Sequence, residues 1–153
     1  MTDIDGKNPD QADRDWMFNQ SAAIPFRFEE GAPRLLLVTS RRKKHWVVPK
    51  GIIEPHLSPS ESAAQEAWEE AGIRGRIRPH PVGEYKYDKW GGTCRVQVFL
   101  LEVTEELAEW PEAFFRERRW VSVEEAAELV DQGGLRRLIH LVPGLIDSGP
   151  GQV

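Results

Sequence analysis

The sequence predicts a single α/β domain, and three observations lead to this fold class. Apolar runs with strand-like alternation occur at residues 35–39 and, most clearly, at residues 93–103. Helix starts of the form Ser-x-x-Glu occur at Ser58 and Ser122. The chain has 153 residues, 40% of them hydrophobic, which suits one domain with a substantial core.

Composition argues against several classes of protein. No apolar run is long enough to span a membrane, and residues 1–10 lack the basic start and apolar centre of a secretory signal. A single cysteine, Cys94, forms neither an internal disulfide nor a metal cluster, so we expect a cytoplasmic location and a packing role for this thiol. The net charge of −5 argues against nucleic acid as a general partner.

The N-terminal part begins with a polar, turn-rich segment. We expect a flexible arm, a folded domain and a flexible tail, over residues 1–17, 18–147 and 148–153 respectively. Two strands are predicted at residues 21–28 and 35–39, joined as a hairpin through the turn residues 29–33. Pro25 inside the first run indicates an edge or bulged position, because proline cannot donate to a strand ladder.

A basic connection over residues 40–45 precedes a short apolar strand over residues 46–48 and then Pro49-Lys50-Gly51. Residues 41–44 are four consecutive cations. Arginine forms bidentate bonds to phosphate and lysine offers a mobile point charge, so we expect phosphate contacts in this region.

The next element is a helix with marked ends. Ser58 is a good N-cap, Pro59 suits the first helical position, and Glu61 completes a capping box. Gly72 is suited to the left-handed conformation that closes a helix. The spacing therefore predicts a helix that begins after Ser58 and ends before Gly72.

This helix has two predicted faces. The expected buried stripe consists of Ala64, Ala67, Trp68 and Ala71. Roughly opposite lie Glu66, Glu69 and Glu70. Glutamates three and four residues apart repel one another, and a hard divalent cation such as Mg²⁺ takes carboxylate oxygens as ligands. The pattern is that of a divalent-metal site, with a solvated acidic face as the alternative.

The C-terminal part adds a second hairpin and two further helices. Its predicted strands cover residues 82–89, 93–103 and 118–121, and its predicted helices cover residues 122–131 and 135–146. Ser122 and Glu125 form a second capping-box motif, Gly133-Gly134 is expected to break the first helix, and Pro143 to interrupt the second.

The stretch from Gly51 to Ile73 resembles the Nudix box, which has the pattern Gly, five residues, Glu, seven residues, Arg-Glu, aliphatic, any, Glu-Glu, any, Gly, aliphatic. The matching positions are Gly51, Glu66, Glu69, Glu70, Gly72 and Ile73. Leu57 stands where the family has its first Glu, and Gln65 where it has Arg. Losing both removes an anion and a cation together, which is gentler than leaving one of them unpaired.

The resemblance implies a Nudix fold, an α/β/α sandwich with a central mixed β-sheet, and hydrolysis of a diphosphate linkage by metal-activated water. By resemblance, Glu66, Glu69 and Glu70 would be the catalytic residues that bind Mg²⁺ or Mn²⁺, with a backbone carbonyl near Lys50 and Gly51. Nudix enzymes often use one more carboxylate from a loop outside the box. Four glutamates of one acidic loop are candidates: Glu105, Glu106, Glu109 and Glu112.

Outside the box, short segments between about residues 20 and 142 resemble the diphosphoinositol polyphosphate phosphohydrolases, which also cleave diadenosine polyphosphates. These are residues 37–41, 46–49, 70–72, 95–104, 118–120 and 124–126. The implied substrate is a small polyphosphate, and the implied enzyme is a monomer or homodimer. The implied substrate-binding residues are Ser40, Arg41, Lys50, Gly51, Arg95 and Arg118.

Two alternatives stay open. A different nucleoside diphosphate derivative, such as a nucleotide sugar or a capped RNA end, would keep the mechanism and change the pocket. A degenerate Nudix domain that binds without catalysis would explain Leu57 and Gln65.

Overall fold

The structure is a computed structural model, and the residues that it describes are 17–42, 45–89 and 91–146. The predicted tail, residues 148–153, lies outside this range. So does the predicted arm, residues 1–17, except for Met17, which is the first residue of strand β1 (Met17–Glu29). These two predictions therefore stay predictions.

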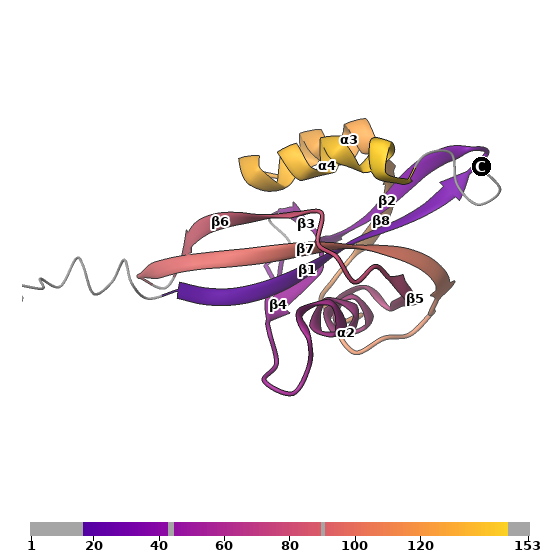
Figure 1. Ribbon diagram of the computed structural model, residues 1–153. Coiled ribbons are helices and arrows are strands. Elements are labelled where there is room, and N and C mark those ends of the chain that lie inside the picture. Colours follow the sequence, from indigo (N-terminus) through magenta and orange to yellow (C-terminus); the bar gives the residue numbers. More distant parts are fainter. Residues whose placement is uncertain (1–16, 43–44, 90, 147–153) are drawn as a thin grey trace, which may run out of the picture.

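Three helices of the described chain cover the two faces of one sheet (Figure 1). Helix α2 (Pro59–Ala71) lies below the sheet in this view, whereas α3 (Val123–Leu129) and α4 (Gly133–Ile146) lie above it. The predicted α/β/α sandwich is therefore confirmed.

The sheet is mixed, as predicted. Besides β1, its strands in the described chain are β2 (Ala32–Thr39), β3 (Trp46–Val47), β4 (Lys50–Ile52), β5 (Ile73–Ile77), β6 (Gly83–Lys89), β7 (Gly92–Glu106) and β8 (Arg118–Ser122). The main order is β3-β2-β1-β7-β5, with β4 on β1, β6 on β7 and β8 on β2. Only β1 and β7 pair in parallel among the described pairs. Both predicted hairpins are present, whereas β4 and β5 lie in segments for which no strand was predicted.

The edge or bulge expected at Pro25 is wrong, because β1 is a central strand. One side of β1 pairs with β7, and the other side is shared by β4, opposite Gln20–Ala22, and β2, from Phe26 onward. The Ala23 N–H donates to the Pro49 carbonyl at 3.0 Å on this shared side. Since strand residues alternate in direction, the Pro25 nitrogen points to the same side, between β4 and β2. A missing N–H therefore breaks no ladder there.

Helix α2 packs closely on the sheet because its buried face is made mostly of small residues, with Glu70 as the exception. Its capping box is formed, with Ser58 Oγ accepting from the Glu61 N–H, and Gly72 adopts a left-handed φ of 69°. The buried face consists of Ser62, Ala63, Ala67, Glu70 and Ala71. The predicted stripe was thus rotated, because Ala64 and Trp68 are only partly buried while Glu70 is 7% exposed.

The last two helices also differ from prediction. In the predicted second capping box, Ser122 Oγ accepts from the Glu125 N–H at 3.0 Å. The Glu125 carboxylate, however, accepts at 2.7 Å from Arg119, a residue of the neighbouring strand β8. Helix α4 begins at Gly133, and Pro143 lies within it without ending it.

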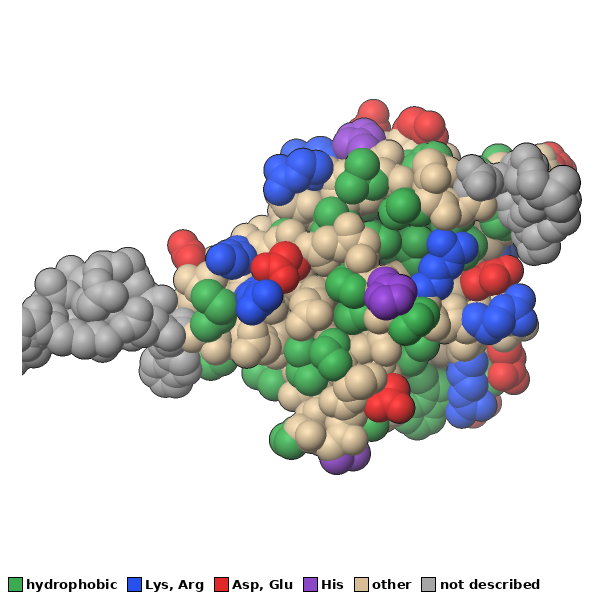
Figure 2. Space-filling model, viewed as in Figure 1, with side chains coloured by type: hydrophobic (Ala, Val, Ile, Leu, Met, Phe, Trp, Pro, Cys, Tyr) green, Lys and Arg blue, Asp and Glu red, His purple; other side chains and the backbone are tan. Residues whose placement is uncertain are grey.

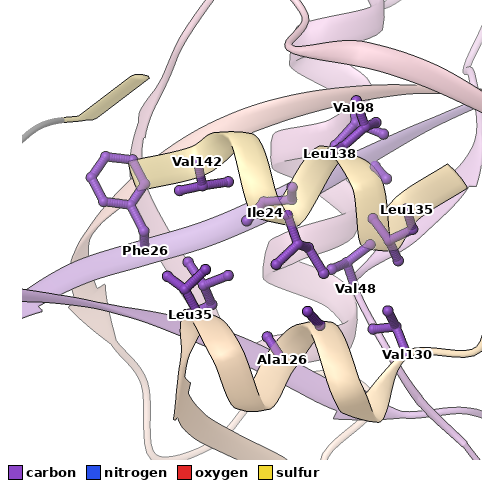
Figure 3. Packing of buried hydrophobic residues seen from close by; sticks show 14 of the residues in the cluster. Ile24, Phe26, Leu35, Val48, Val98, Ala126, Val130, Leu135, Leu138 and Val142 are labelled. Carbon is purple, nitrogen blue, oxygen red and sulfur yellow. The ribbon is translucent and has the colours of Figure 1, made fainter. Parts of the chain in front are cut away.

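Alternate residues of the central strands supply two hydrophobic layers. Ile24 and Phe26 point towards α3 and α4, where they pack with Leu35, Val98 and Leu138 (Figure 3). The layer beneath α2 contains Ala23, Leu36, Val38, Ala63, Ala67, Ala71, Ile73, Phe99 and Leu101. Each large aliphatic side chain buried in these layers stabilises the fold by about 1.5–3 kcal/mol, so the sheet is held from both faces.

The surface carries charges of both signs. Figure 2 shows acidic, basic and hydrophobic side chains interspersed over one face of the molecule. None of the helices in the described residues combines the length and the apolar character needed to cross a membrane.

Candidate functional site

A cavity of about 660 Å³ joins the basic connection after β2, strand β4 and helix α2. It collects two of the three acidic box residues, Glu66 and Glu70, and several cations at one place. Its lining residues are Gln20, Ser40, Arg41, Arg42, His45, Val47, Val48, Lys50, Gly51, Glu66, Glu70, Lys89, Glu112 and Arg116.

Helix α2 presents two carboxylates to β4 at very short range. A Cβ added to Gly51 would lie 2.3 Å from Glu66 Oε2, so this position admits only glycine without moving the carboxylate. The Lys50 N–H donates to Glu70 Oε1 at 3.3 Å. The backbone of β4 therefore fixes where Glu66 and Glu70 can lie.

The loop after β7 delivers a third carboxylate and a buried cation. The Glu112 N–H donates to the Glu69 carbonyl at 3.1 Å, which ties this loop to α2. Arg116 is 8% exposed; its Nε lies 2.8 Å from Glu112 Oε1, and its Nη2 lies 3.4 Å from Glu70 Oε2. Its Nη1 donates to the Thr39 carbonyl at 2.8 Å. Of the four candidate glutamates, Glu105 and Glu106 belong to strand β7 and not to this loop, and Glu112 is the one that lines the cavity.

Burial raises the pKa of both central carboxyl groups. It raises the pKa of Glu66 to about 7, with a further contribution from the charge of Glu69. It raises the pKa of Glu70 to about 8, although the Arg116 guanidinium opposes this. The buried Glu70 and the half-buried Glu66, two neighbouring acids that resist ionisation, form a place where added positive charge is favourable.

The donor chemistry fits a hard divalent cation, because Glu66, Glu70 and Glu112 bring carboxylate oxygens to one cavity. In the part of the chain that the structure describes, no three acidic, His or Cys side chains already converge as a metal-ligand group. Glu69 does not line this cavity, and its Oε2 accepts from Gln65 Nε2 at 2.8 Å. The site therefore fits a divalent cation through its donor types and needs side-chain rotation to surround one.

Four of the six predicted substrate-binding residues line the cavity, namely Ser40, Arg41, Lys50 and Gly51. Lys50 is half-buried, and this burial, followed by the charge of Lys89, lowers its pKa. Its Nζ donates to the Tyr87 hydroxyl at 3.0 Å. The cavity thus holds cations beside carboxylates, as a site for a metal and a polyanion requires.

Arg95 and Arg118 lie elsewhere. Arg95 donates to both oxygens of Glu84 across the β6–β7 pair, at 2.9 and 3.0 Å. The Arg118 guanidinium donates to the carbonyls of Ala71 at 2.8 Å and Leu107 at 2.6 Å. Neither lines the cavity, because Arg95 is held by a neighbouring strand and Arg118 closes the end of α2.

Sequence reasoning missed Arg116, Gln20 and His45 as lining residues. Arg116 stands only two residues before Arg118, and no local pattern separates the two arginines. The alternation of side chains along β8 does not indicate the direction of the Arg116 side chain, since Arg116 precedes that strand.

Residues 17–142 match the NUDIX domain model, which covers most of the chain. The chain belongs to the Nudix family. Among curated Nudix relatives, it is 40% identical over 110 residues to Nudix hydrolase 13, mitochondrial, of Arabidopsis thaliana, an alignment that covers 65% of this chain and 54% of the relative. It is 35% identical over 121 residues to diphosphoinositol polyphosphate phosphohydrolase 2 of Rattus norvegicus, covering 77% and 65%. The chain thus spans about half to two thirds of the length of these relatives.

Solved structures support the Nudix fold. A binary complex of a C. elegans Ap4A hydrolase matches with a TM-score of 0.67 at 20% identity, over 84% of this chain and 96% of that chain. The MutT protein from Methanosarcina mazei Go1 matches with a TM-score of 0.64 at 22% identity, over 86% and 96%. At these identities the likeness shows the fold alone.

Proposed function

We propose that this Nudix protein is a divalent-metal-dependent pyrophosphohydrolase. The observation that carries the proposal is the gathering of three carboxylates, Glu66, Glu70 and Glu112, with cationic side chains in one cavity. Carboxylates would hold a cation, and the cations would hold phosphate oxygens. Such a combination suits phosphoryl chemistry, in which positioning and charge neutralisation supply most of the catalysis.

The proposed roles follow from position. Glu66 and Glu70 would hold Mg²⁺ or Mn²⁺, and Glu69 would join them if it turned away from Gln65. When bound, the cation would neutralise phosphate oxygens and make a bound water more acidic. Glu112, whose Oε1 lies 2.8 Å from Arg116, would accept the proton of the attacking water. Arg116 would then be well placed to contact the phosphate nearest the carboxylates.

For the substrate, we propose a dinucleoside polyphosphate or a diphosphoinositol polyphosphate. The basic side chains that line the cavity support the proposal of a long anionic chain as the substrate. They are Arg41, Arg42, His45, Lys50, Lys89 and Arg116. Among similar proteins, one relative is named for diphosphoinositol polyphosphates and one structural neighbour for Ap4A. Both names denote compounds with linked phosphates.

The test is product analysis by mass spectrometry with purified protein and Mg²⁺, with EDTA in a parallel series. The panel contains diadenosine polyphosphates, diphosphoinositol polyphosphates, nucleotide sugars, capped RNA and nucleoside triphosphates. Mg²⁺-dependent cleavage of either proposed class supports the proposal. Cleavage of nucleotide sugars or capped RNA alone would keep the reaction and replace the substrate.

A binding module without catalysis is the second candidate, and the bond that holds Glu69 on Gln65 favours it. Against it, Leu57 and Gln65 line a separate cavity of about 570 Å³ with Trp68 and Arg74, which shares no lining residue with the carboxylate cavity. The two departures from the box therefore lie away from Glu66 and Glu70. Folded protein that binds these compounds and cleaves none of them would establish the binding module. The cytoplasmic location and the monomeric or homodimeric state stay predictions.

A further inference from the structure

Lys50 connects the two faces of the sheet. Its backbone N–H donates to Glu70 Oε1, on the α2 side. Lys50 pairs with Ala22, which belongs to the hydrophobic layer beneath α3 and α4, and residues opposite each other in an antiparallel pair point to the same face. The Lys50 side chain therefore extends away from α2, while its own backbone holds a carboxylate of the acidic cluster.

The Lys50 ammonium ends on the hydroxyl of Tyr87 in β6, with Nζ 3.0 Å from that oxygen. The Tyr87 hydroxyl in turn donates to Gln20 Oε1 at 2.9 Å. A phenol has one proton to donate, so the bond to Gln20 turns the oxygen lone pairs towards Lys50. The direction of this hydrogen-bond chain is thereby set by Gln20, which is 4% exposed on the central strand β1.

The position of the ammonium matters because two cavities meet there. Lys50 lines both the main cavity and a side cavity of about 170 Å³ that also includes Tyr87. An ammonium has three donors, so a bond to Tyr87 is compatible with donation to phosphate oxygens at the same time. A free lysine side chain would lose rotamer entropy on binding a ligand, and prior fixation by Tyr87 reduces that loss.

We propose that Tyr87 is a positioning residue, directed by Gln20, that holds the Lys50 ammonium where it binds a phosphate of the substrate chain beyond the acidic cluster. The proposal rests on the proposed function, because it assigns a polyphosphate to the main cavity. It places the part of the substrate remote from Glu66 and Glu70 on the side of the sheet covered by α3 and α4.

The test measures binding, so that it does not depend on turnover. Calorimetry with inorganic tripolyphosphate in EDTA is run on wild type, Tyr87→Phe, Lys50→Met and the double variant. Tyr87→Phe keeps the ring and removes the hydroxyl, and we expect Kd to rise about tenfold, the usual effect of one bond to a charged group. The double variant should bind no more weakly than Lys50→Met, because Tyr87 acts through Lys50. Gln20→Leu should give a smaller loss in the same direction.

Tyr85→Phe is the matched control. The Tyr85 ring stacks on Tyr87 with centroids 6.2 Å apart, but Tyr85 takes no part in the hydrogen bonds that join Lys50, Tyr87 and Gln20. Its Kd should equal that of wild type. A Tyr87→Phe variant with wild-type Kd, or one whose loss adds fully to that of Lys50→Met, would overturn the inference. Where a panel substrate is cleaved, Tyr87→Phe should raise KM about as much as Kd and leave kcat nearly unchanged. Absence of cleavage with the expected Kd pattern would remove the proposed reaction and keep this inference.

Discussion

Gly51 and Glu66 are in such close contact that a Cβ on Gly51 would lie 2.3 Å from Glu66 Oε2. The atoms it would meet are at the end of a flexible side chain, so Gly51→Ala should fold while displacing the Glu66 carboxylate. Misplacement of a reacting group by about 1 Å costs on the order of 100-fold in rate, and we expect kcat/KM to fall by about that factor. Steady-state kinetics with a melting curve for each protein checks this.

Gly133→Ala is the control for that substitution. An added Cβ on Gly133 meets no atom within 4 Å, and the residue is the first of α4. Alanine is a better helix former than glycine, so stability should be unchanged or slightly higher, with full activity. Equal activity of Gly51→Ala and Gly133→Ala would show that Glu66 need not occupy its present position.

Glu112→Gln should lower kcat by about 100-fold or more, because a positioned general base typically contributes that much. Glu109→Gln changes an exposed glutamate of the same loop that does not line the cavity, and it should leave kcat unchanged. The comparison is made by initial rates at saturating substrate. If the two variants have equal rates, Glu112 is not the base.

Arg118→Ala should lower stability more than activity. The Arg118 guanidinium donates to the Ala71 and Leu107 carbonyls and stacks on Trp110 at 4.0 Å from the ring centroid. Leaving these partly buried carbonyls without a donor should cost about 2–4 kcal/mol of unfolding free energy. Urea denaturation measures that loss, and KM of the folded fraction should stay at the wild-type value. A higher KM without loss of stability would restore Arg118 to the substrate-binding residues.

The stability of the metal-free protein should fall as pH rises. The folded-state pKa values of Glu66 and Glu70, about 7 and about 8, exceed the ordinary 4.5, so the folded chain keeps protons that the unfolded chain releases. Stability is therefore lost between about pH 4.5 and pH 8, and Glu70→Gln should flatten that slope.

Mg²⁺ should act against this trend, because it binds the ionised carboxylates. The increase in Tm produced by Mg²⁺ should thus be larger at about pH 8.5 than at about pH 6. Thermal unfolding in EDTA and in Mg²⁺ over this range checks both statements. A Mg²⁺ effect that is independent of pH would speak against carboxylate ligands at this site.

The box and its helix were predictable because their signals are local. The capping box at Ser58, the left-handed Gly72 and the spacing of Glu66 and Glu70 depend on neighbours within one or two turns. The rotation of the buried stripe from Ala64 to Ala63 was not predictable, since both positions hold alanine and the residue type does not say which of the two is buried. Burial of Glu70 reversed the expected preference, because the Lys50 backbone N–H and the buried Arg116 guanidinium contact its carboxylate.

Features that depend on distant contacts were beyond the sequence. Arg116 and Glu112 reach the cavity because their loop is bonded to the Glu69 carbonyl, a contact between segments 43 residues apart. The central position of Pro25 depends on where β4 and β2 leave β1 unpaired. The predicted phosphate contact of Arg95 neglected its partner across the hairpin, Glu84, which accepts two hydrogen bonds from the guanidinium.

The most direct measurement is hydrolysis by Glu70→Gln and wild type at equal Mg²⁺ on diadenosine tetraphosphate and a diphosphoinositol polyphosphate. This substitution removes one charge at nearly constant shape. We expect wild type to cleave at least one compound and Glu70→Gln to be slower by about 1,000-fold, with its fold intact by circular dichroism. Near-normal hydrolysis by the variant would contradict the assignment of the carboxylate cluster as the metal-binding centre.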